Sequence, residues 1–473
     1  MKHILRHLIP ALGLALLGAC GGGGDASPTT DNSTTPSDTS GSAPAVNTAT
    51  AITGTSAYGV LGTATARIAF VPSGQGVIPI LLESSGTATI SSGRTQPAAA
   101  IAATAPSVPL VPFSFPVDAC TIDSNDAKGV CIGFGSSKVG VMDLTTFATT
   151  LHVADIGVTE FDSGAGTVAN SYSGGSCILC AVASDIGKHR FVIGGAGGFR
   201  VFSYGSTTAS AVYDIPVGEN FAFLPQPAGS SYIVAPEYEP NGGQRKLRVV
   251  NVDTAKTYVW TRNTDSVADL GQAGAIFETS EVDAAAVDIN TKMIAMSAET
   301  GGDFLLVDFG QATFDETALT FSAPFTIAAP NPATSVSRLT DVAISTQGSI
   351  LLSHGEANSN IGVVQLPASA GSSGAFTGVA GPLGVFDLND PGFDRTPCGA
   401  SYVFSGKFDP HGLGLYAGLD NGQRGLIVDS SNSCAALIDL AGMIAAAHVA
   451  ADPNRIDTSL PSVAALVVFV KLH

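Results

Sequence analysis

Acidic side chains recur at one place in a series of similar segments, and carboxylate oxygens are the ligands that calcium prefers. Glu299, Glu356 and Asp420 each lie five or six residues before an apolar segment that we expect to be a third strand, and Glu237 lies in the matching connection of another segment. We expect these connections to open on one face. The simpler interpretation is a solvated acidic rim, and the functional hypothesis is a Ca²⁺ site.

Two histidines lie close to carboxylates in the sequence. His354 is two residues from Glu356, and His411 is two residues from Asp409. A histidine next to a carboxylate can act as a general base, but residues two apart on a strand face the same side in any case. His354 is therefore a weak catalytic candidate. No nucleophile elbow, phosphate-binding loop, zinc-type His/Glu motif or dinucleotide fingerprint is present, so the sequence favours a protein without catalytic residues.

Six cysteines follow Cys20, and an even number in an exported chain indicates disulfides. They are Cys120, Cys131, Cys177, Cys180, Cys398 and Cys434. Cys120 and Cys131 fall at opposing positions on adjacent expected strands, so we pair them. Cys177 and Cys180 can close a small loop, which leaves Cys398 for Cys434, although a link from Cys177 or Cys180 to Cys398 stays open.

These residues lie in seven repeated units, each an apolar strand, a polar turn, a second strand, a loop and a third strand. The units span 119–143, 181–203, 221–251, 284–308, 341–365, 404–429 and 446–469. Third strands end about every 54 residues, a period that indicates a β-propeller. Further apolar segments such as 211–217 and 256–261 are expected to add a fourth, outer strand to each unit.

The last unit reaches the C-terminus without a fourth strand. Segment 77–91, ahead of the first unit, is apolar enough to supply it. Pairing the two chain ends would close the ring and remove exposed sheet edges. We therefore expect an all-β, seven-bladed propeller, with six blades as the alternative if the N-terminal segment packs elsewhere.

Repeated aspartates mark the turn between the first and second strands. They are Asp123, Asp185, Asp288, Asp409 and Asp452. Because aspartate side chains accept hydrogen bonds from a turn backbone, we interpret all five as turn residues. The long connections between units, 161–177, 262–284 and 381–401, are the better candidates for binding, since long loops on a rigid scaffold commonly bind ligands.

The N-terminus resembles the export signal of bacterial lipoproteins. Lys2 and Arg6 precede a short apolar stretch that ends in Leu17-Gly18-Ala19-Cys20, similar to a lipobox. The resemblance implies that residues 1–19 are a lipoprotein signal peptide, cleaved before Cys20, and that Cys20 carries the lipid. Gly21 after the cysteine favours the outer membrane in this family.

Composition separates a tether from a folded domain. Residues 20–55 are rich in Gly, Ser, Thr and Pro, and we expect a disordered tether. Residues 56–473 are assigned to the propeller domain. The chain has 55 Gly and only 13% charged residues, as expected of a turn-rich β protein, and its net charge of −18 argues against nucleic acid as a partner.

The third strands resemble those of YVTN and lactonase-like propellers, which read roughly V-x-V-I-D. Segments 139–143, 305–308 and 426–429 match as VGVMD, LLVD and LIVD, whereas Ser203, Asn251 and Gln365 replace the aspartate elsewhere. The resemblance is to a divergent member, and it concerns the fold more than activity.

We therefore expect a monomeric, lipid-anchored lipoprotein of the bacterial cell envelope, facing the periplasm or the surface, whose propeller binds a protein or small-molecule ligand. The alternatives are a Ca²⁺-assisted lactonase-like hydrolase that uses the acidic rim, and a non-catalytic envelope assembly factor.

Overall fold

The chain is all-β throughout its described part, with only short helical turns. The computed structural model describes residues 67–72, 76–82, 110–123, 125–133, 135–150, 153–165, 178–179, 181–185, 188–195, 198–215, 222–224, 230–236, 247–260, 282–288, 292–298, 304–328, 339–344, 350–355, 359–365, 381–404, 413–418, 424–429, 434–439 and 466–471. The helical elements are α3 (Phe147–Thr150), η1 (Val153–Asp155), η3 (Phe309–Gln311) and η4 (Thr396–Cys398). None of the described helices has the length and apolar character needed to cross a membrane.

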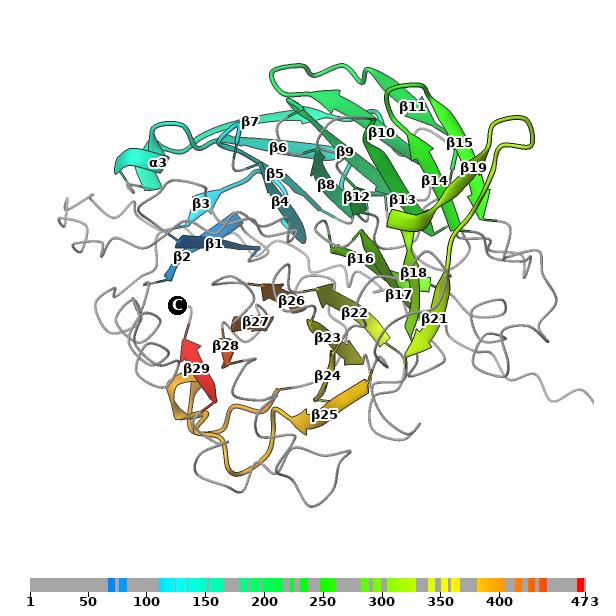
Figure 1. Cartoon of the computed structure of the whole chain (residues 1–473). Helices are drawn as coiled ribbons and strands as arrows, with labels where there is room; N and C mark the ends of the chain where they lie inside the picture. The colour runs from blue at the N-terminus through cyan, green and yellow to red at the C-terminus, as the bar shows by residue number, and fades with distance from the viewer. Residues whose placement is uncertain are drawn as a thin grey trace, which may run out of the picture.

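Seven sheets follow one another along this described part (Figure 1). The first four have the strand orders β1-β2-β3, β4-β5-β6-β7, β11-β10-β9-β8 and β12-β13-β14-β15. Their strands are β1 (Arg67–Pro72), β2 (Gly76–Leu82), β3 (Val111–Pro112), β4 (Ala119–Asp123), β5 (Lys128–Ile132), β6 (Lys138–Asp143), β7 (Gly157–Asp162), β8 (Ala181–Asp185), β9 (Arg190–Gly195), β10 (Gly198–Ser203), β11 (Ala211–Tyr213), β12 (Ala222–Leu224), β13 (Tyr232–Pro236), β14 (Leu247–Asn251) and β15 (Lys256–Trp260).

The last three sheets are β16-β17-β18-β21, β22-β23-β24-β25 and β26-β27-β28-β29. A hairpin, β19-β20, lies between β18 and β21 in the chain but joins the preceding sheet, because β20 pairs in parallel with β15. The strands are β16 (Val282–Asp288), β17 (Met293–Ala298), β18 (Phe304–Asp308), β19 (Thr313–Asp315), β20 (Thr320–Ser322), β21 (Phe325–Ala328), β22 (Leu339–Ile344), β23 (Ile350–Gly355), β24 (Asn360–Gln365), β25 (Gly381–Asp387), β26 (Leu413–Gly418), β27 (Arg424–Asp429), β28 (Cys434–Asp439) and β29 (Val467–Lys471).

Consecutive sheets pack face to face. Val139 of β6 and Phe191 of β9 share one buried cluster between neighbouring sheets, and Val192 and Ile233 share the next. The first strands contact one another in chain order, β4 with β8, β8 with β12, β12 with β16, β16 with β22 and β22 with β26. Sheets of consecutive antiparallel strands, stacked side by side around a ring (Figure 1), define a β-propeller, which confirms the predicted fold class.

Ring closure and blade number stay predictions. Segment 77–91 was expected to pair with the C-terminal strand, but only its first residues are described, in β2, which pairs with β1 and β3. The described partner of β29 is β28. Most of the predicted seventh unit, and residues 83–91, lie outside the described ranges.

The repeat boundaries agree well with the strands. Five predicted third strands end where β6, β10, β14, β18 and β24 end, and the predicted outer segments at 211–217 and 256–261 contain β11 and β15. Asp429 differs, because it ends β27, the second described strand of its sheet.

One predicted loop is wrong in its first part. Residues 381–387, assigned to the long connection 381–401 between units, form β25, the outer strand of its sheet. The register with β24 shifts between Val363 and Val364, where Pro382 and Gly384 are the successive partners. An outer strand with a bulge tolerates a proline, which has no N–H to donate.

The segment after β3 packs on the sheet β4–β7 through glycines. The ring of Phe113 occupies the space that a β-carbon on Gly140 would need, and the carbonyl of Pro116 does the same at Gly133. Both glycines therefore allow the segment that contains Phe113 and Pro116 to approach the sheet β4–β7 closely.

Substituting Gly140 with alanine is expected to destabilise the fold by about 1–3 kcal/mol, because the new methyl group overlaps the Phe113 ring. Gly157→Ala in the same sheet is the control, since its β-carbon would meet only Asp143 Cβ, at 3.6 Å. Denaturant unfolding of both variants measures the difference. Equal stabilities would contradict the packing described.

Candidate functional site

Most residues proposed from the sequence lie outside the described ranges. These are Cys20, Cys177, Cys180, Glu237, Glu299, Glu356 and Asp420. His354 is placed as a backbone position in β23, opposite Asp341 and Ile361. Within the ranges that are described, no three His, Cys, Asp or Glu side chains form a group that could hold a metal ion. The calcium hypothesis therefore stays a prediction.

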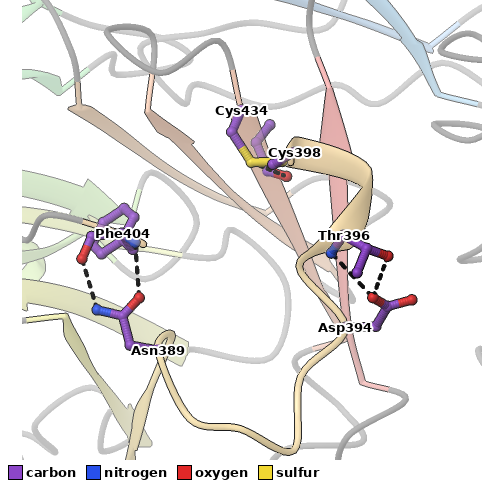
Figure 2. The surroundings of a disulfide bond; sticks show 7 residues. Asn389, Asp394, Thr396, Cys398, Phe404 and Cys434 are labelled. Atoms are coloured by element: carbon purple, nitrogen blue, oxygen red, sulfur yellow. Dashed lines mark hydrogen bonds between the residues drawn. A yellow bond between two sulfur atoms is a disulfide. The ribbon is translucent and has the colours of Figure 1, made fainter. Parts of the chain in front are cut away.

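One long segment that follows a sheet is described over residues 388–404, directly after β25, and we call these residues the pinned loop. A disulfide joins Cys398 in η4 to Cys434 in β28, with Cα atoms 5.5 Å apart (Figure 2). The second described disulfide joins Cys120 and Cys131, directly opposed on β4 and β5. Both pairings agree with the sequence prediction.

Side-chain hydrogen bonds fix the two ends of the pinned loop to each other. The Asn389 amide donates to the Phe404 carbonyl at 2.7 Å and accepts from the Phe404 N–H at 2.8 Å (Figure 2), so it replaces one rung of a strand ladder. Arg395 Nη1 donates to the carbonyl of Leu388 at 3.2 Å.

Three aspartates shape the turns of this segment. Asp387 and Asp390 accept hydrogen bonds from the backbone N–H groups of Asn389 and Gly392. Asp394 accepts from both the hydroxyl and the N–H of Thr396 (Figure 2), and these bonds lower the pKa of its carboxyl group. The carboxylates therefore hold turns in place.

Aromatic packing fixes the underside of the pinned loop. Phe393 contacts Phe386 and Phe469, and Tyr402 also contacts Phe469. The outer side is exposed and carries both polar and apolar groups. Its exposed residues are Pro391, Gly392, Asp394, Thr396, Pro397, Gly399, Ala400, Ser401 and Val403. Val403 is 59% exposed, unusual for a large apolar side chain. This arrangement can present a preformed surface to a partner.

The repeated aspartates have two different roles. Asp123 accepts hydrogen bonds from the N–H groups of Asn125 and Asp126, which confirms the turn interpretation there. Asp288 ends β16, and Asp409 and Asp452 lie outside the described residues.

Asp185 corrects the turn interpretation. Its side chain is fully buried, and its two oxygens accept from Arg190 Nε at 2.6 Å and from the Ser231 hydroxyl at 2.9 Å. Arg190 Nη2 also lies 2.8 Å from Asp253. Burial raises the pKa of Asp185, and the bonds from Arg190 and Ser231 oppose that rise. The group links the sheet β8–β11 to the sheet that begins with β12.

Sequence reasoning missed Arg190, Ser231 and Asp253. Ser231 and Asp253 are 46 and 68 residues from Asp185, in another repeat, so only the packing of sheets brings them together. The sequence did indicate one part of this group, the pairing of Asp185 with Arg190, because Arg190 stands at the start of the strand that follows Asp185.

Comparisons with known proteins return distant solved structures and no family. No protein-family model matches the chain, and no curated protein sequence does. Among solved structures, the β-propeller domain of Cps50 (Swd1) from Myceliophteria thermophila has 10% identity and a TM-score of 0.41, over 69% of this chain and 82% of that one. Hydrazine synthase from Kuenenia stuttgartiensis has 10% identity and a TM-score of 0.44, over 73% and 84%. A functionally unknown protein from Desulfotomaculum acetoxidans has 9% identity and a TM-score of 0.43, over 77% and 92%. The propeller assignment rests on the sheet order of this chain itself.

Removing the disulfide of the pinned loop is expected to expose Arg395 to trypsin. The double variant Cys398→Ala, Cys434→Ala should lose about 2–4 kcal/mol of stability and be cut after Arg395 in limited digestion, which mass spectrometry of the fragments detects. The control is Cys120→Ala, Cys131→Ala, which removes a disulfide from the core and leaves the loop intact. Cleavage at the same rate in both variants would show that Cys398 does not hold the loop.

Proposed function

We propose that the chain is a lipid-anchored envelope lipoprotein whose β-propeller binds a protein partner, with the pinned loop as the contact surface. The observation that carries the proposal is the combination of fixed backbone and exposed side chains in residues 388–404. A disulfide, the Asn389–Phe404 bonds and aromatic packing hold the loop from below, while Thr396, Ser401 and Val403 remain exposed.

A preformed loop favours binding for a thermodynamic reason. Association costs about 0.5–1.5 kcal/mol for each flexible side chain that becomes ordered, and more when a backbone segment must be ordered too. A loop already fixed by the fold avoids the backbone part of that cost. The exposed Val403 can then bury apolar area, while the exposed hydroxyl groups of Thr396 and Ser401 in the same loop form hydrogen bonds.

The anchor is the second part of the proposal. The lipobox-like segment ending at Cys20 and the tether-like composition of residues 20–55 support attachment to the outer membrane. Lipidation with several acyl chains would give a stable anchor, whereas one chain alone binds only marginally.

Val403→Glu is expected to abolish capture of the partner. We would cross-link the tagged full chain in its native cells and resolve adducts by mass. A charge buried within a contact surface costs at least ten-fold in affinity, so the discrete adduct of the wild type should disappear. The control is Val212→Glu, a valine 56% exposed on β11 of another sheet, which should keep the adduct. If both variants kept the adduct, or both lost it, the pinned loop would not be the contact surface.

Cys20→Ala is expected to release the protein from the membrane. The wild-type chain should enter the detergent phase and incorporate an alkyne-labelled fatty acid, and the variant should do neither. Cys434→Ala serves as a thiol control that keeps the label. Incorporation of the fatty-acid label by the Cys20→Ala variant would contradict lipidation at this residue.

A further inference from the structure

Arg200 is a buried cation whose charge has no counterion among the described residues. It lies in β10, is 8% exposed, and faces the sheet β4–β7, because Phe202 two positions later packs in the cluster between these sheets. Its guanidinium donates from Nη2 to the carbonyl of Gly164 at 3.1 Å. None of the ion pairs between described residues includes Arg200.

The same sheet contains a second, partly buried arginine, Arg190, whose surroundings differ. Arg190 lies within 2.8 Å of carboxylate oxygens of both Asp185 and Asp253. A guanidinium has five N–H donors and is always charged, and its burial without a counterion costs several kcal/mol. The described partner of Arg200 is a neutral carbonyl, whereas Arg190 lies against two carboxylates.

Among the described carboxylates, that of Asp162 is engaged elsewhere. The oxygens of Asp162, the nearest acidic residue in sequence to Gly164, accept from the Gly164 N–H at 2.8 Å and from the Ser137 hydroxyl at 3.0 Å. The sequence from 166 to 177, which follows, contains no Asp or Glu.

The guanidinium lies near the surface of the seam between the two sheets. Gly164 is exposed, adopts the left-handed conformation (φ +70°), and has open space where a β-carbon would be. It directly follows the end of β7, as the pinned loop follows β25, and the fourth strands of a propeller all finish at one end of the ring. Arg200 thus reaches the end that carries the pinned loop.

We propose that Arg200 and the turn at Gly164 form a binding point for a carboxylate group. The planar fork of the guanidinium matches a carboxylate with two parallel hydrogen bonds. The inference rests on the proposed binding function, since it names a chemical group that the binding end would recognise. The chain has a net charge of −18, and Arg200 marks one place in it where an anion would be favoured.

The test measures the thermal midpoint of the full chain in chloride, acetate and phosphate at equal ionic strength. Acetate should raise the wild-type midpoint by about 2 °C or more at saturation. Arg200→Met should have a midpoint in chloride at or above that of the wild type, because it removes a buried charge that pairs with no described carboxylate, and should not respond to acetate. Arg200→Lys, which keeps the charge without the fork, should respond less than the wild type, and Arg190→Lys should keep the full response.

A wild type indifferent to acetate, together with a lower midpoint of Arg200→Met in chloride, would overturn the inference and make Arg200 a structural residue. A response to phosphate but not to acetate would overturn the choice of carboxylate. Loss of the cross-linked adduct in Arg200→Met would assign the carboxylate to the protein partner, and its retention would assign it to a free small molecule. If acetate does not stabilise the wild type but the cross-linked adduct still forms and still depends on Val403, the carboxylate inference fails and the proposed function stands.

Discussion

Burial of both faces of each sheet against its neighbours is the constraint on which the rest of this structure depends. Phe191 and Phe202 stack at 5.4 Å in the seam between the sheets β4–β7 and β8–β11, and Phe199 of the same sheet is buried in the next seam. A sheet covered on both sides carries apolar residues at successive positions. Each fully buried large apolar side chain contributes about 1.5–3 kcal/mol, so every seam holds a large gross stabilisation.

That stabilisation decides what polar groups the seams can contain. Asp185 and Ser231 are buried and Arg190 is partly buried, and the hydrogen bonds to Asp185 offset the cost of removing its charge from water. Arg200 has one hydrogen bond to a carbonyl and no carboxylate among the described residues. The seam that contains the Phe191 cluster is rich in buried apolar side chains, so the fold can tolerate a charged group at its edge.

Much of the fold could be predicted from the sequence, because each unit repeats the same order of strands and turns. The ends of five third strands, from Asp143 to Gln365, follow directly from that period. Features that depend on distant partners could not be predicted. The hairpin 313–322 joins a sheet other than its own, and the environment of Arg190 combines residues of two repeats. For the pinned loop, the cysteines and the loop position were readable, but the Asn389–Phe404 bonds were not, since they depend on the path of the backbone between them.

The described polar groups are used differently at the two ends of the ring. At the end with the first turns, Asp123 caps its turn, and Asp185 and Asp253 hold Arg190 across a seam. These carboxylates are committed to the fold. At the opposite end, the disulfide and the aromatic contacts of the pinned loop leave its outer side chains exposed, and Arg200 retains donors that no described side chain uses. Binding requires polar and apolar groups that are not already used in holding the fold together. The end that carries the pinned loop is therefore the better one for binding a ligand.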